Sequence, residues 1–191
     1  MKAALHVLCA AGALMLALPV QAASNLECIA NSATAEEQAT IDRYIRNFRG
    51  GTAEDRDDLV FVQELISEIS FGCAMENHWG GDAEGLARLA AVSRVKEAAL
   101  RNGKAISPEL LAKYDAFIAA RGSAMVDIFD RIAREQLGFG EGEQKAGDEE
   151  ALQSFALALG IEKQSAVSDA IMELSFSAAV QRVIKAEFGS Y

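Results

Sequence analysis

The residues best equipped for chemistry lie between positions 76 and 84 of this 191-residue chain, which spell ENHWGGDAE. Glu76, His78, Asp82 and Glu84 offer side chains that can bind zinc or calcium. A stable zinc site needs several nitrogen or sulfur ligands, however, and the acids lack the spacing of a calcium loop. We therefore expect no bound metal and no cofactor. We interpret the stretch as a connector between helices, in which Trp79 covers the end of a bundle.

Catalytic motifs are mostly absent from the sequence. His78 is the only histidine after residue 22, which excludes the paired Glu-x-x-His sites of di-iron bundles and the His-Glu-x-x-His of zinc proteases. There is no Cys-x-x-Cys-His for haem and no glycine-flanked serine elbow. Ser93 and Lys96 match the Ser-x-x-Lys of penicillin-binding enzymes, but Lys-Thr-Gly is missing, so we expect a solvated helical turn there. The catalytic residues of any enzyme activity remain unknown.

The first 22 residues have the pattern of a secretory signal. Lys2 is followed by an apolar run over residues 3–20, and small residues surround a cleavage site after Ala22. An uncleaved membrane anchor is the competing interpretation. The run is slightly short for that role, and Pro19 followed by small residues favours cleavage. We expect residues 1–22 to be a signal peptide and residues 23–191 to form one helical domain, periplasmic or secreted and not embedded in the membrane.

Two cysteines, Cys28 and Cys73, remain once Cys9 has left with the signal. A pair in an oxidising compartment usually forms a disulfide. Two helical arms of about 30 Å each, joined near Gly50, would return Cys73 to the level of Cys28. A redox-active role is the alternative, but no Cys-x-x-Cys is present and Cys73 lies on an apolar stripe. We therefore predict a structural disulfide.

Composition predicts an all-α fold. The chain is 51% apolar, contains only two prolines and is rich in alanine, which has the highest helix propensity. Its net charge of −10 opposes binding to nucleic acid. Helix starts and apolar periodicity predict a bundle of five or six helices pinned by the disulfide. The expected helices cover residues 34–48, 52–76, 82–101, 107–137, 148–159 and 162–187, and the span 107–137 is either one helix or two because Gly122 interrupts its stripe.

The second of these helices is expected to be central. Phe61 and Phe71 widen its apolar stripe, which contains Leu59, Val62, Leu65, Ile66, Ile69 and Cys73. Residues 68–74 also resemble residues 173–179 at a constant offset. Duplication of a helical hairpin would leave this trace, but two core helices with similar packing needs would do so as well.

The sequence predicts function only coarsely. The leading hypothesis is an exported, non-enzymatic binding or interaction protein whose protein or small-molecule partner is unknown. The alternatives are a cell-envelope hydrolase that uses acidic residues, as lysozyme-like glycosidases do, and a weak carrier of a metal or small ligand. A cleft holding a carboxyl group of raised pKa would favour an enzyme, and an exposed apolar groove would favour a binding protein.

Overall fold

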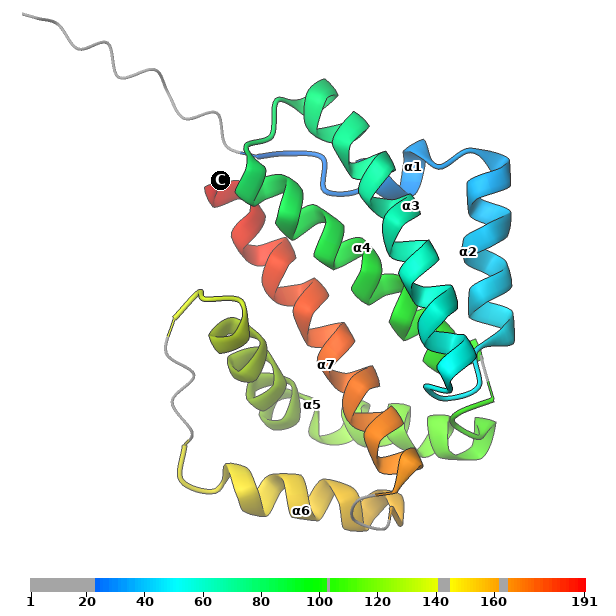
Figure 1. The fold of residues 1–191 in the computed structure, drawn as a ribbon. Helices are drawn as coiled ribbons and strands as arrows, with labels where there is room; N and C mark the ends of the chain where they lie inside the picture. The colour runs from blue at the N-terminus through cyan, green and yellow to red at the C-terminus, as the bar shows by residue number, and fades with distance from the viewer. Residues whose placement is uncertain (1–22, 103, 141–144, 162–164) are drawn as a thin grey trace, which may run out of the picture.

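Figure 1 shows a computed structural model of the chain, which describes residues 23–191 apart from positions 103, 141–144 and 162–164. The regular structure of these residues is entirely helical, which confirms the predicted all-α class. The predicted signal peptide lies outside the described residues. The elements are α1 (Cys28–Ser32), α2 (Ala35–Asn47), α3 (Ala53–Asn77), α4 (Gly81–Asn102), α5 (Pro108–Gln136), α6 (Asp148–Leu159), α7 (Ala166–Glu187) and a 3-10 helix, η1 (Phe188–Ser190).

The expectation of five or six helices is wrong, because the described residues form seven α-helices and one 3-10 helix. The six expected helices correspond to α2–α7. Both additional elements are short, since α1 has five residues and η1 has three. Apolar periodicity needs a window of about 11 residues or more to be visible. The predicted start of the last helix at residue 162 lies outside the described residues.

Most helix boundaries follow from local sequence signals. The hydroxyls of Thr34, Thr52 and Ser107 each accept a hydrogen bond of 3.1–3.3 Å from the backbone N–H three residues further on. These bonds satisfy N–H groups that the first helical turn leaves without partners. Gly50 and Gly51 take the positive φ angles +106° and +89° that separate α2 from α3. The span 107–137 forms one helix, α5, which bends near its middle (Figure 1).

Helix α4 lies at the centre of the bundle. It contacts α2 and α3 on one side and α7 on the other, while α5 packs on α7 and α6 packs on α5 (Figure 1). Small side chains allow these close contacts, and α4 buries the alanines Ala83, Ala87, Ala90, Ala91 and Ala99. In the described part of the chain, none of the helices combines the length and the apolar character needed to cross a bilayer.

Helix α3 differs from expectation in two respects. The sequence predicts that it is the central helix, but α4 lies between α3 and α7 and takes that place. Part of its apolar stripe is also exposed. Its predicted stripe is buried at Val62, Ile66 and Cys73. Phe61 and Phe71, expected to widen that stripe, are instead 59% and 62% exposed. The apolar arc of α3 is wider than the surface that α1, α2 and α4 cover, so part of it faces solvent.

Candidate functional site

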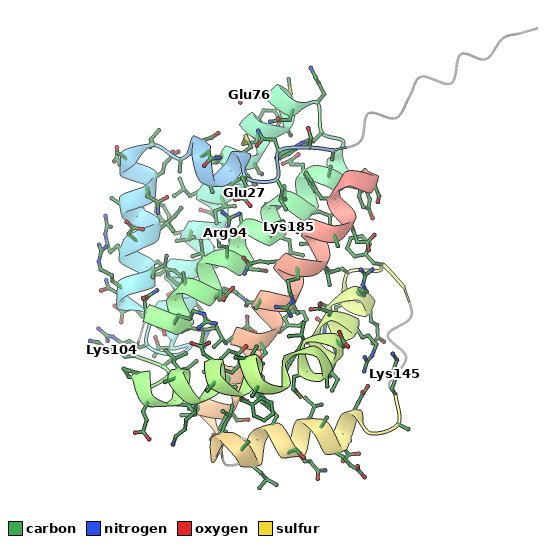
Figure 2. All side chains as sticks on the ribbon, turned by 180° about the vertical axis from the view of Figure 1, so that it is seen from behind. Glu27, Glu76, Arg94, Lys104, Lys145 and Lys185 are labelled. Carbon is green, nitrogen blue, oxygen red and sulfur yellow. A yellow bond between two sulfur atoms is a disulfide. The ribbon has the colours of Figure 1, made fainter. Side chains whose placement is uncertain are left out.

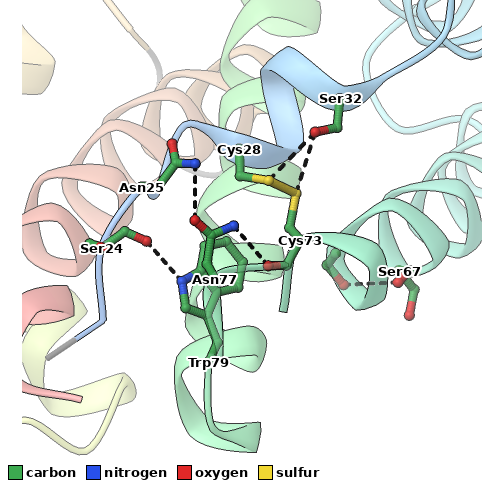
Figure 3. The surroundings of a disulfide bond; sticks show 9 residues. Ser24, Asn25, Cys28, Ser32, Ser67, Cys73, Asn77 and Trp79 are labelled. Carbon is green, nitrogen blue, oxygen red and sulfur yellow. Dashed lines mark hydrogen bonds between the residues drawn. A yellow bond between two sulfur atoms is a disulfide. The ribbon is translucent and has the colours of Figure 1, made fainter. Parts of the chain in front are cut away.

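The structure brings Cys28 and Cys73 together. Their Sγ atoms lie 2.09 Å apart, at the distance of a disulfide bond, and join the start of α1 to the last turns of α3. The hydroxyl of Ser32 lies 3.5 Å from the sulfur of Cys28 and 3.7 Å from that of Cys73 (Figure 3). Both cysteines are buried. Burial of both sulfurs favours a structural role over a redox-active one.

The expected connector is shorter in the structure: residues 78–80 join α3 to α4, and the rest of the stretch 76–84 belongs to the end of α3 and the first turn of α4. His78 is the C-cap of α3 in the left-handed conformation, with φ +56°. Trp79 is buried, and its Nε1 donates a hydrogen bond of 2.8 Å to the backbone carbonyl of Ser24 (Figure 3). Among the described residues, no group of three or more histidine, cysteine or acidic side chains could hold a metal ion.

The Ser-x-x-Lys match has no catalytic arrangement. Ser93 is buried within α4, so the expectation of a solvated turn is wrong. The Nζ atom of Lys96 lies 2.7 Å from Oε1 of Glu173 on α7, in an ion pair that joins the two helices. The lysine is therefore directed to a carboxylate rather than to the serine hydroxyl.

Three carboxyl groups in the described residues have a pKa that departs clearly from its ordinary value, and in all three it is lowered. A hydrogen bond from the backbone of Thr34 lowers the pKa of Glu37, and one from Arg131 lowers that of Asp148. For Asp55, burial raises the pKa, but backbone hydrogen bonds from the loop before α3 outweigh burial and lower it. A general acid at neutral pH needs the opposite shift.

The solvent-facing side of α3 exposes four large apolar side chains. Val60, Phe61, Phe71 and Met75 are exposed by 53%, 59%, 62% and 66%. Exposed acidic residues lie between them on the same side of the helix. We call this set the outer face of α3; it consists of Asp57, Val60, Phe61, Glu64, Glu68, Phe71 and Met75.

An open groove of about 490 Å³ lies beside the outer face of α3, between α3 and α4. Val60 forms part of its wall, opposite the exposed Leu89 of α4. Arg88 also lines the groove and donates a hydrogen bond of 3.2 Å to the hydroxyl of Ser67. The groove extends the exposed apolar surface from α3 towards α4.

Two smaller recesses lie on other sides of α3. One, of about 140 Å³, is lined mainly by apolar residues such as Ile41, Ile66 and Ile69. Arg94 at this recess is ion-paired with Glu27 at 2.9 Å, and Figure 2 shows both side chains between α4 and the start of α1. The other, of about 220 Å³, lies where α2, α3, α4 and α7 meet.

Comparison with known proteins gives no assignment: no family model, curated protein or solved structure matches the chain. The residues of the outer face of α3 were not among the candidate sites found in the sequence. The signal that would have found them is the width of the apolar arc, because Phe61 and Phe71 lie outside the arc that one layer of neighbouring helices can cover.

Proposed function

We propose that the protein is an exported, non-enzymatic binding protein, and that the outer face of α3 binds a basic, apolar helix of a partner protein. One observation carries the proposal: four large apolar side chains on one side of a helix are more than half exposed, while the opposite side of that helix is buried. Large exposed apolar side chains gathered on one side of a helix are typical of interaction sites. A helix laid along such a surface buries it without any change in the bundle.

The charges on the outer face of α3 define the partner. Asp57, Glu64 and Glu68 are exposed among the apolar side chains, so a partner with lysine or arginine at matching positions would have the complementary potential. From Asp57 to Met75 the face is about 27 Å long, which corresponds to about five helical turns. A second copy of this chain fits poorly, because it would place the same acids opposite one another and the chain as a whole carries −10.

Two features support export. Residues 1–22 have the pattern of a cleaved secretory signal, and disulfides persist mainly in oxidising compartments. The three clearly shifted carboxyl pKa values are all lowered, which gives a hydrolase no support.

Two designed helical peptides test the proposed partner chemistry. They share one apolar pattern, and one carries lysine and the other glutamate at the remaining positions. Fluorescence anisotropy of labelled peptide, titrated with the mature protein, should show binding of the lysine peptide only. Binding should weaken as salt is added, because exposed charges are screened within about 10 Å at 0.1 M salt.

Variants locate the binding surface. Phe71→Ser should weaken binding of the lysine peptide by about tenfold or more, because large apolar contacts dominate interface energy. Leu157→Ser is the matched control, since Leu157 is 80% exposed but lies on α6. Equal binding of both peptides, or equal effects of the two substitutions, would contradict the proposal. Sedimentation equilibrium checks the competing outcome, in which the outer face of α3 joins two copies of the chain.

A further inference from the structure

The cavity where α2, α3, α4 and α7 meet has an apolar wall and a polar one. The apolar wall consists of Phe48, Leu59 and Leu100. The polar residues that line the cavity include Tyr44, Lys96 and Glu173. Its volume of about 220 Å³ is equivalent to roughly seven water molecules at ~30 Å³ each. This volume lies below the ~300 Å³ at which pockets for drug-sized ligands begin. The cavity therefore suits a small molecule.

Tyr44 provides the first indication of a ligand. The residue is only 4% exposed, yet its hydroxyl makes no hydrogen bond with any described residue. None of the fully buried side-chain polar atoms in the described residues lacks a hydrogen-bond partner, so the Tyr44 hydroxyl keeps contact with solvent and is accessible to a ligand in the cavity that Tyr44 lines. Burial raises the pKa of Tyr44, and the carboxylates of Asp55, Asp58 and Glu173 raise it further. The hydroxyl is therefore neutral at physiological pH and lies in a negative potential, which favours contact with a positively charged group.

Two other polar residues of the wall bind the loop between α2 and α3. The carboxylate of Asp55 accepts from the backbone N–H groups of Arg49, Gly51 and Thr52. The guanidinium of Arg56 donates a hydrogen bond of 2.8 Å to the backbone carbonyl of Gly51. These contacts shape the loop between α2 and α3. The exposed Arg56 keeps unused donors, but Lys96 is the cation that is paired with Glu173 at the cavity, so the candidate ligand contacts are those of Tyr44, Lys96 and Glu173.

Lys96 and Glu173 provide the second indication. Their side chains are 33% and 42% exposed and form an ion pair of 2.7 Å. In the described structure, Lys96 donates only to this partner and Glu173 accepts only from it. An ammonium group has three N–H donors and a carboxylate has two oxygens. Both side chains therefore have unused hydrogen-bonding capacity, of opposite charge, at one edge of the cavity.

We propose that this cavity binds a small zwitterion, an α-amino acid with a short apolar side chain. The ligand's carboxylate accepts from Lys96, its ammonium group donates to Glu173 and to the hydroxyl of Tyr44, and its side chain packs against Phe48, Leu59 and Leu100. A ligand with one charge alone would satisfy only one member of the Lys96–Glu173 pair and would disturb the other. The site is separate from the outer face of α3, and the inference does not depend on the proposed function.

Calorimetric titration of the mature protein with three matched compounds tests the inference. L-Valine carries both charges, isobutylamine lacks the carboxylate, and isovalerate lacks the ammonium group. L-Valine should bind, and each analogue should bind at least about tenfold more weakly, because a hydrogen bond between charged groups is worth a factor of this size. Absence of binding by L-valine would overturn the inference. Equal binding by isovalerate or isobutylamine would also overturn it, in favour of a simple anion or cation site.

Conservative variants test the individual contacts. Tyr44→Phe removes only the hydroxyl, and Glu173→Gln removes only the charge; each should weaken L-valine binding by about tenfold. Tyr114→Phe is the matched control, because the hydroxyl of Tyr114 contacts Ser175 at 3.3 Å, and Tyr114 does not line this cavity. Circular dichroism confirms that each variant is folded. Unchanged binding by folded Tyr44→Phe and Glu173→Gln would overturn the assignment of this cavity.

Discussion

Trp79 and Ser24, which are 55 positions apart in the chain, are joined by a hydrogen bond of 2.8 Å from the indole Nε1 to the backbone carbonyl. The indole ring also packs edge-on against Phe188, with ring centroids 5.4 Å apart. One side chain therefore connects the segment before α1, the connection between α3 and α4, and the C-terminal η1 helix. This is the bundle-end role that the sequence predicts for Trp79.

Replacing Trp79 with alanine should lower the free energy of unfolding by about 3 kcal/mol, because a buried indole leaves a cavity that the surrounding residues fill only partly. Trp79→Phe keeps most of the packing and loses the hydrogen bond to Ser24, so it should cost about 1 kcal/mol. Urea denaturation measures both values. A loss below 1 kcal/mol for Trp79→Ala would show that this end of the bundle does not depend on the indole.

His78 is expected to matter through its backbone. It occupies the left-handed C-cap position of α3 with φ +56°, where a residue with a Cβ is strained. His78→Ala should therefore be less stable than His78→Gly by about 1 kcal/mol. Thermal denaturation of the two variants measures the difference. The opposite order of stability would contradict this prediction. A stoichiometric metal in the wild-type protein that is absent from His78→Ala would also contradict it, because the imidazole would then have a role as a ligand.

The unreduced protein should have no free thiol at Cys28 or Cys73. The cross-link spans a sequence separation of 45, for which the chain-entropy model gives about 4 kcal/mol as an upper value. Reduction should therefore lower the melting temperature. Helix content by circular dichroism should persist, because α5, α6 and α7 lie outside the closed loop. Thiol titration in denaturant that finds two reactive groups per chain would contradict the disulfide.

Asp55 should make stability depend on acid pH. Burial raises its pKa, but hydrogen bonds from the backbone of Thr52 and Arg49 lower it more, so the folded-state pKa lies below the ordinary value of 3.8. The charged form therefore stabilises the fold above about pH 4, and this contribution is lost as the pH falls through the folded-state pKa. Asp55→Asn should lower stability at pH 7 by about 1 kcal/mol, since water near the exposed loop screens part of the interaction. Urea denaturation from pH 7 to pH 3 measures the free energy of unfolding of wild type and variant. The difference between the two values should become smaller below pH 4. A difference that does not change with pH would contradict the role assigned to Asp55.

Local signals predict much of this fold. The starts of α2, α3 and α5 follow from Thr34, Thr52 and Ser107, because capping depends on residues only three positions apart. Helix α1 has only five residues, too few for a periodic pattern, and the predicted helix count was wrong for that reason.

The candidate sites are harder to predict because they depend on tertiary packing. Periodicity places Phe61 and Phe71 beside the apolar stripe of α3, but it does not show how many neighbours cover that helix, and both side chains are exposed. The cavity at Tyr44 needs Glu173 from α7, more than a hundred residues away. No short-range pattern connects residues at that distance.

The most direct test of the central claim is site-specific photo-crosslinking in the cells that make the protein. A photoreactive phenylalanine analogue is placed at position 71 on the outer face of α3 or, as the control, at position 157 on α6. We predict an adduct at position 71 only, and mass spectrometry should map it to a helical segment of another protein with a net positive charge and an apolar side. Crosslinking of position 71 to a second copy of this chain or to an acidic segment, or the same adducts at both positions, would contradict the account.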